Sequence, residues 1–158
     1  MLTVSAGAGE KDVLDYVNTF IGTSSMGHVF PGACVPHGGV QLSPDTEAAP
    51  FYRDGKYNRE TYRYCAGYQY GDPTIVGFSH THLSGTGHSD LGDILMMPVS
   101  GEICLEPGTV ENPGYRSRFS HDTEKAVPGY YEVYLEDSGV KAQLTATKRA
   151  GVHKYTFR

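Results

Sequence analysis

The segment from Gly77 to Asp93 holds the residue types best suited to chemistry in this chain, in the run GFSHTHLSGTGHSDLGD. It combines three histidines, three serines and two aspartates with four glycines. Imidazoles and carboxylates can bind a metal ion, hydrogen-bond a polar ligand or transfer protons. Gly85 and Gly87 would allow positive φ angles and bring backbone amides close to a ligand. The composition therefore predicts a polar site and not a hydrophobic core.

The first half of this segment must position the histidines. Its Thr, Ile, Val and Phe content predicts a β-strand over Ile75 to His82. Because side chains alternate along a strand, His80 and His82 would then share one face with Phe78. Asp90 and Asp93 follow at the entrance to an apolar run, which begins at residue 94.

Two imidazoles on one face, with His28, His88, Asp90 or Asp93 nearby, could ligate zinc or iron. The spacing of these residues does not select a tetrahedral site. We therefore favour histidines that hydrogen-bond to backbone or to sugar hydroxyls, and the sequence predicts no metal ligands in this chain.

Other catalytic motifs are weaker. The run from Gly77 to Thr81 lacks the second glycine of the GxSxG nucleophile motif. The run from Gly85 to Asp90 starts like a dinucleotide fingerprint, but Asp90 occupies the third glycine position. An acid and base pair for glycoside hydrolysis could come from several carboxylates, among which the sequence cannot choose: Asp45, Asp54, Asp72, Asp90, Asp93 and Glu102.

The elements that would carry these residues are short strands. Apolar and polar residues alternate over 131–136, 140–147 and 152–158, with a turn at 137–139, which predicts an antiparallel meander. A second hairpin is expected from 94–99 and 102–105. Residues 18–45 have glycine or proline every few positions and predict ordered loops that carry His28 and His37. The predicted fold class is all-β, an incomplete antiparallel β-sandwich with long glycine-rich loops.

Bulk properties set further limits. A chain of 158 residues suffices for one domain, which we place at 13–158 after a disordered tail at 1–12. The net charge of −5, without a basic cluster, argues against a nucleic-acid partner. No run of 18 apolar residues predicts a membrane span. The three cysteines are interpreted as small buried residues, with one disulfide possible.

Two terminal features indicate export and truncation. Residues 4–8 resemble the small-residue tail of a cleaved secretion signal, which predicts a periplasmic or extracellular location. The chain ends at Arg158 in the middle of a predicted strand, so we expect it to be a piece of a longer protein.

Five motifs in order carry a resemblance to a known family. They are VNTFIGT from Val17, GHVFPGA from Gly27, VQLSPDT from Val40, GYQY from Gly67 and GFSHTHLSGTGHSDLGDILMMP from Gly77. Together they resemble the N-terminal domain of glycoside hydrolase family 92, the α-mannosidases of bacterial glycan-degrading systems. The match is close over residues 17–98 and looser over the strands that follow.

The resemblance implies a calcium-dependent, inverting exo-α-mannosidase, built from an N-terminal supersandwich-like β-domain and a C-terminal (α/α)6 barrel. In that family the general acid, the general base and most calcium ligands lie in the barrel, so none of the catalytic residues is expected in this chain. The β-domain would help to line the cleft for a terminal mannose, and alone it would be inactive. The residues expected to contact sugar or the barrel are His28, Phe30, His80, His82, Ser84 and Asp90.

Two alternatives remain open from the sequence. One is a stand-alone metal-dependent enzyme of cupin type, in which His80, His82 and Asp90 would hold the ion. The other is a non-catalytic carbohydrate-binding module, which would bind mannose without a partner domain.

Overall fold

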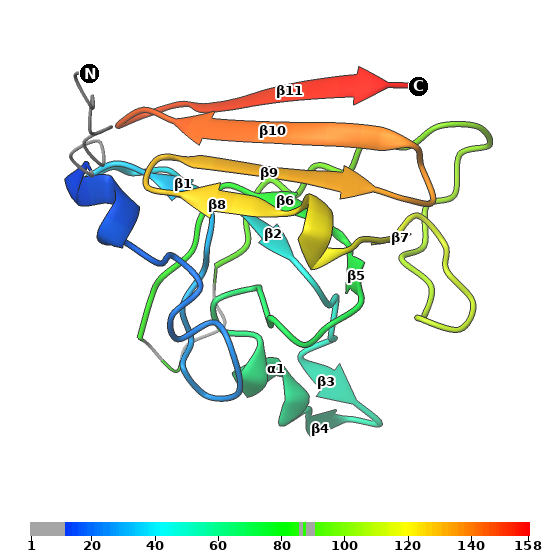
Figure 1. The fold of residues 1–158 in the computed structure, drawn as a ribbon. Helices are drawn as coiled ribbons and strands as arrows, with labels where there is room; N and C mark the ends of the chain where they lie inside the picture. The colour runs from blue at the N-terminus through cyan, green and yellow to red at the C-terminus, as the bar shows by residue number, and fades with distance from the viewer. Residues whose placement is uncertain (1–11, 86, 88–90) are drawn as a thin grey trace, which may run out of the picture.

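The computed structural model describes residues 12–85, 87 and 91–158. Its largest element is a four-stranded antiparallel sheet in the order β11-β10-β9-β8 (Figure 1). The strands are β8 (Lys125–Val127), β9 (Tyr130–Leu135), β10 (Val140–Ala146) and β11 (Gly151–Phe157). In β9 and β10 buried residues alternate with more exposed ones, so one face of the sheet supplies the core. The predicted meander is confirmed.

Two turns fix the register of this sheet. Residues 136–139 connect β9 to β10, and Gly139 adopts a positive φ of 66° there. The second turn spans 147–150 and is closed by the Thr147 amide, which donates to the Ala150 carbonyl. Gly151 is the first residue of β11, where it pairs with Ala146.

A second, three-stranded sheet packs against the meander, in the order β1-β2-β6. It consists of β1 (Ala33–Cys34), β2 (Gln41–Asp45) and β6 (Gly77–Ser79), with both pairings antiparallel. Its strands β1 and β2 contact β9 and β10 of the larger sheet. The shared core includes Leu42, Phe78, Tyr131, Val133, Leu135 and Leu144. This arrangement confirms the predicted all-β antiparallel class.

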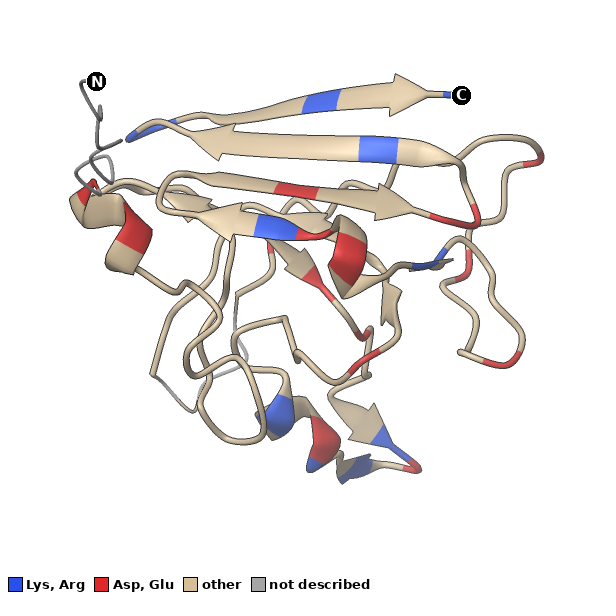
Figure 2. Ribbon diagram, viewed as in Figure 1, with Lys and Arg blue, Asp and Glu red and all other residues tan. Residues whose placement is uncertain are grey.

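Smaller elements complete the domain. The strand β5 (Thr74–Ile75) pairs with β7 (Ser117–Arg118), and β3 (Tyr52–Arg53) pairs with β4 (Lys56–Tyr57). In the described part of the chain, helical turns are limited to η1 (Val13–Tyr16), α1 (Glu60–Arg63) and η2 (His121–Thr123). None of the described helices is long and apolar enough to cross a membrane. Basic and acidic side chains are intermingled over the elements, including α1 and the β3–β4 hairpin (Figure 2).

The strand predicted over Ile75 to His82 is wrong in its extent. The chain leaves β5 at Ile75, resumes as β6 at Gly77 and ends that strand at Ser79. Beyond Ser79 the chain bonds β2 on one side, where the His80 carbonyl accepts from the Gln41 amide, and a loop on the other, where the Asp93 carbonyl accepts from the His80 amide. The Gly92 amide of this loop also donates to the Thr81 carbonyl. Both histidines therefore lie outside the strand.

The hairpin predicted from 94–99 and 102–105 is also wrong. Among the described residues this segment contains only one isolated bridge, between Met96 and Phe78. Ile94, Ile103 and Leu105 are between 72% and 83% exposed. The segment is apolar, but these side chains find no second layer to pack against, and apolar character alone does not make a strand.

The cysteine interpretation holds for one residue of three. Cys65 is buried, whereas Cys34 and Cys104 are exposed, and all three are free thiols. Of the tail predicted at 1–12, residues 1–11 lie outside the described part of the chain. Asp12 caps η1 through its side chain, which accepts from the Leu14 amide.

Candidate functional site

The site begins with a buried ion pair between the end of β2 and the loop that follows β6. Asp45 is the last residue of β2, and its Oδ1 lies 3.1 Å from Nε2 of His82 in the loop after β6. The two side chains are 12% and 2% exposed. The other ring nitrogen of His82, Nδ1, lies 2.8 Å from the Gln41 carbonyl oxygen.

These contacts determine the protonation of His82. A carbonyl oxygen and an ionised carboxylate can only accept, so both ring nitrogens must donate. Burial alone would lower the pKa of His82, but the charge of Asp45 and the hydrogen bonds to Asp45 and Gln41 together raise it. His82 is therefore an imidazolium held by two acceptors.

Ser79 completes this cluster but does not make it a catalytic triad. Its Oγ lies 3.0 Å from Nε2 of His82, the same nitrogen that faces Asp45. In a Ser-His-Asp triad the serine and the aspartate bind opposite nitrogens. Ser79 is also fully buried, and its amide donates to Asp45 Oδ2. The cluster positions the loop and cannot deliver a nucleophile to a ligand.

Gly67 allows the ion pair to form. A Cβ at this position would lie 2.1 Å from Asp45 Oδ1 and 2.9 Å from His82 Nε2, and its φ is 77°. The Gly67 carbonyl accepts from the Thr46 amide, and Thr46 Oγ1 accepts from the Gln69 amide. The two sequence motifs VQLSPDT and GYQY are thus joined at one point beside His82.

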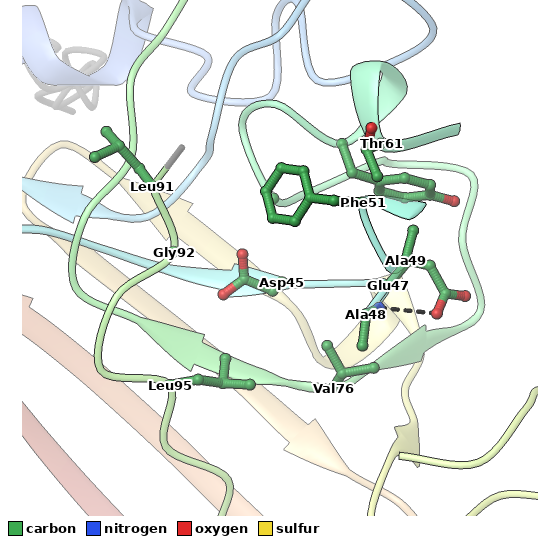
Figure 3. Close-up of a pocket in the computed structure, with 12 residues that line it drawn as sticks. Asp45, Glu47, Ala48, Ala49, Phe51, Thr61, Val76, Leu91, Gly92 and Leu95 are labelled. Atoms are coloured by element: carbon green, nitrogen blue, oxygen red, sulfur yellow. Dashed lines mark hydrogen bonds between the residues drawn. The ribbon is translucent and has the colours of Figure 1, made fainter. Parts of the chain in front are cut away.

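Asp45 also lines a pocket of about 170 Å³. Figure 3 shows its carboxylate between Leu91 and Leu95 on one side and Phe51 and Thr61 on the other. Glu47 at the rim is paired with the buried Arg116, whose Nη2 lies 2.9 Å from Glu47 Oε1. The carboxylates of this pocket therefore already have partners.

A larger groove of about 590 Å³ lies beside the N-terminal loops. Two of the predicted site residues, Phe30 and Ser84, line it together with apolar side chains such as Ile21, Val29 and Pro128. The Phe30 ring also packs 5.4 Å from the His82 ring, measured between centroids. The Asp45–His82 ion pair therefore contacts the groove through the Phe30 ring.

His28 lies next to this groove and has unused hydrogen-bonding capacity. It is 6% exposed, its ring packs edge-on against Tyr62, and its carbonyl accepts from the Gly85 amide at 2.7 Å. Its Nε2 has no hydrogen-bond partner among the described residues, and neither does Thr19 Oγ1 in the groove lining. Buried polar atoms without partners are rare, so these two mark where a ligand or water could bond.

His80 lies apart from the other predicted site residues. Its Nδ1 bonds the Ile94 carbonyl, and its Nε2 lies 3.0 Å from His153 Nε2 in β11. The expectation that His80 and His82 share one face is therefore wrong, because the chain leaves the strand before either residue. Asp90, the sixth predicted residue, lies outside the described residues.

No metal centre is assembled by the described side chains. They contain no group of three or more His, Cys, Asp or Glu residues that could hold an ion. The ring nitrogens of His80 and His82 already face other partners, which argues against the cupin-type alternative. The same residues do not fit a calcium site.

Sequence reasoning missed His153, Tyr62 and Gly67 as parts of this region, and it named Asp45 only among many carboxylates. The pairing of Asp45 with His82 joins residues 37 positions apart. The one sequence signal that could have indicated this pairing is that both residues lie in motifs of the family resemblance. His153 and Tyr62 had no such signal.

Comparison with known proteins places this geometry in context. Residues 16–158 match the glycosyl hydrolase family 92 N-terminal domain. An α-mannosidase of family 92 from Bacteroides thetaiotaomicron, solved with mannoimidazole, is 50% identical, with a TM-score of 0.83 over 93% of this chain and 18% of its own. A family 92 inverting mannosidase from the same organism is 28% identical, with a TM-score of 0.63 over 94% of this chain and 19% of its own.

A protein from Arthroderma benhamiae, named an uncharacterized secreted glycosidase, is 29% identical over 153 residues. That match covers 94% of this chain and 18% of the fungal protein. The chain therefore spans about a fifth of the length of the relatives that it matches.

Proposed function

Because this chain belongs to glycosyl hydrolase family 92 through its N-terminal domain, we propose that it is the N-terminal part of an inverting exo-α-mannosidase. The enzyme would hydrolyse terminal α-mannosyl bonds of glycans. The observation that carries this proposal is the likeness, over most of the chain, to an α-mannosidase solved with mannoimidazole.

This chain and the rest of the polypeptide would contribute different parts of the active site. In an inverting mechanism one carboxyl group protonates the leaving oxygen, and another activates water on the opposite face of the sugar. The pocket carboxylates of this chain are held by His82 and Arg116. We therefore place the acid and the base on a C-terminal helical barrel of the same polypeptide, with this chain as one wall of the cleft.

Four of the six predicted site residues then have a role consistent with their position. Phe30 would pack against the pyranose face, and Ser84 and His28 Nε2 would hydrogen-bond sugar hydroxyls. His82 would act as a positioning residue, since it is buried beneath Phe30. His80 lies away from the groove, and we propose no sugar contact for it. The proposed contact of Asp90 rests on the sequence alone.

The groove can be tested by Phe30→Ala in the full-length enzyme. Loss of the aromatic face should raise the KM for an aryl α-mannoside at least several-fold while the protein stays folded. Tyr52→Ala provides a control, because Tyr52 is an exposed aromatic residue of β3 that lines neither the groove nor the pocket of Figure 3. An unchanged KM in Phe30→Ala, or an equal change in both variants, would remove the groove from the sugar site.

Calcium dependence and secretion are further parts of the proposal. We place the calcium ligands mainly on the barrel, so a chelator should abolish turnover by the full-length enzyme without unfolding this domain.

A periplasmic or extracellular location is supported by residues 4–8 and by the name of the fungal relative. Cell fractionation with an antibody to the domain would test the location.

A carbohydrate-binding module would behave differently from half of a cleft. Titration calorimetry of the 158-residue chain with mannobiose should detect no binding if the second wall is needed. Saturable binding by this chain alone would favour the module.

A further inference from the structure

The two sheets are joined at one edge by a pair of facing imidazoles. His80, which follows β6, and His153 in β11 have their Nε2 atoms 3.0 Å apart. Their ring centroids are 4.9 Å apart. Gly151 leaves room for this contact, since a Cβ there would lie 2.7 Å from His80 Cδ2.

The outer nitrogens of the pair determine which proton each ring carries. His80 Nδ1 faces the Ile94 carbonyl at 2.8 Å, so it must donate, and in neutral His80 the Nε2 atom is an acceptor. His153 Nε2 must then donate to it. His153 Nδ1 in turn accepts from the Tyr155 hydroxyl, which lies 2.6 Å away. A continuous series of hydrogen bonds therefore runs from the Tyr155 hydroxyl through both rings to the Ile94 carbonyl.

This series of hydrogen bonds can take up one extra proton but not two. If His80 gains a proton on Nε2, His153 can shift its own proton to Nδ1 and donate to the Tyr155 oxygen. A second added proton would give both rings an N–H at Nε2, so that two donors and two positive charges meet at 3.0 Å. We propose that the His80–His153 pair is a proton-dependent latch, which holds β11 against the first sheet and opens when both imidazoles are protonated.

Among the described residues no carboxylate bonds to either imidazole of the pair. His153 is paired across the sheet with Leu144, and the carboxylate of Asp93 in the facing loop accepts from the Thr81 hydroxyl. Burial lowers the pKa of His153, and the charge of His80 lowers it further. The described residues next to the pair are Tyr155 of β11, which bonds His153, Leu144 of β10, which lies opposite His153, and Leu42 of β2, which lies beside Gly151. Asp93 of the loop reaches His80 through its backbone carbonyl, which accepts from the His80 amide.

Opening would release β11 from the first sheet. Among the described strands β11 pairs only with β10, and its aromatic contact with the first sheet is Tyr155 against Phe78 at 6.4 Å. The sign of the effect follows from linkage. A histidine whose folded pKa is lowered contributes stability above its unfolded pKa of about 6.5 and loses it as the pH falls through that value and on through its folded pKa.

The test is nitrogen-detected NMR of the histidine rings in the 158-residue chain across a pH titration. At pH 8 we expect His80 as the Nδ1–H tautomer and His153 as the Nε2–H tautomer. As the pH falls below the unfolded histidine pKa of about 6.5 and both rings take up a proton, the scalar coupling across the His80–His153 hydrogen bond should disappear, and the amides of β11 should exchange at least several-fold faster. Two Nε2–H tautomers, or a His153 that titrates at an ordinary value of about 6.5, would overturn the latch.

The matched variant is His153→Gln, whose amide can donate to His80 and accept from Tyr155 without titrating. It should fold, and the acid-induced rise in β11 exchange should be at least halved. His37→Asn is the control, because His37 is exposed in a turn with a positive φ that Asn tolerates. Equal acid sensitivity in His153→Gln and in the native chain would contradict the proposal. This result would leave the mannosidase proposal intact, since no sugar is involved.

Discussion

The residue that organises the candidate site is Asp45, whose carboxylate holds a buried imidazolium. Replacing it with Asn would leave the His82 ring without its countercharge, while the Gln41 carbonyl still demands a donor. Breaking a buried pair from one side costs about 3–5 kcal/mol. We expect Asp45→Asn to lower the free energy of unfolding by this order in urea denaturation.

Asp54→Asn is the matched control, because Asp54 is exposed in a turn with a positive φ of 53°, where Asn is well tolerated. It should change the unfolding free energy by no more than about 0.5 kcal/mol. Equal stability of the two variants would mean that the His82 pair contributes little to the fold.

The Asp45–His82 pair predicts a pH dependence of stability that is opposite in sign to that of the His80–His153 pair. The pKa of His82 is raised in the folded state, so its stabilisation is complete below the unfolded pKa of about 6.5 and is lost as the pH rises through the folded value. Urea unfolding of the native chain should therefore show falling stability above pH 6.5 from this residue. A His82→Gln variant should lack that slope, and an unchanged slope would argue against the imidazolium.

At the scale of elements, Gly67 is the position where two motifs meet most closely. Gly67→Ala would introduce a Cβ at 2.1 Å from Asp45 Oδ1, in addition to the strain of a φ of 77°. Gly55→Ala isolates the second effect, since Gly55 has a φ of 72° and open space around it. We expect Gly67→Ala to cost on the order of 1–3 kcal/mol more than Gly55→Ala, measured by urea denaturation. Equal losses of unfolding free energy in the two variants would show that Asp45 and His82 can move away from the added Cβ.

The sequence predicted those elements whose burial alternates along the strand. The meander from 130 to 157 was recognisable because each strand has one buried face and Gly139 marks a turn. The segment 94–105 was misread because its apolar side chains remain exposed. The strand expected through His82 was overestimated because the His80 amide bonds the loop around Asp93 and not a neighbouring strand.

Local sequence spacing carried only part of the geometry of the candidate site. Phe30 and Ser84 do line one groove, with His28 beside it. His80 and His82 have different partners, His153 and Asp45, because both residues lie beyond the end of β6. Contacts between residues far apart in the chain are not encoded by local spacing, so the ion pair and the imidazole pair required the structure.

At the scale of the whole molecule, the central claim is that this chain is one wall of a mannoside cleft without its reacting carboxylates. The most direct measurement is product formation from an aryl α-mannoside with calcium, comparing the 158-residue chain with the full-length enzyme. The account predicts turnover by the full-length enzyme and none by the chain alone, even when circular dichroism shows that the chain is folded. Turnover of the mannoside by the chain alone would contradict it.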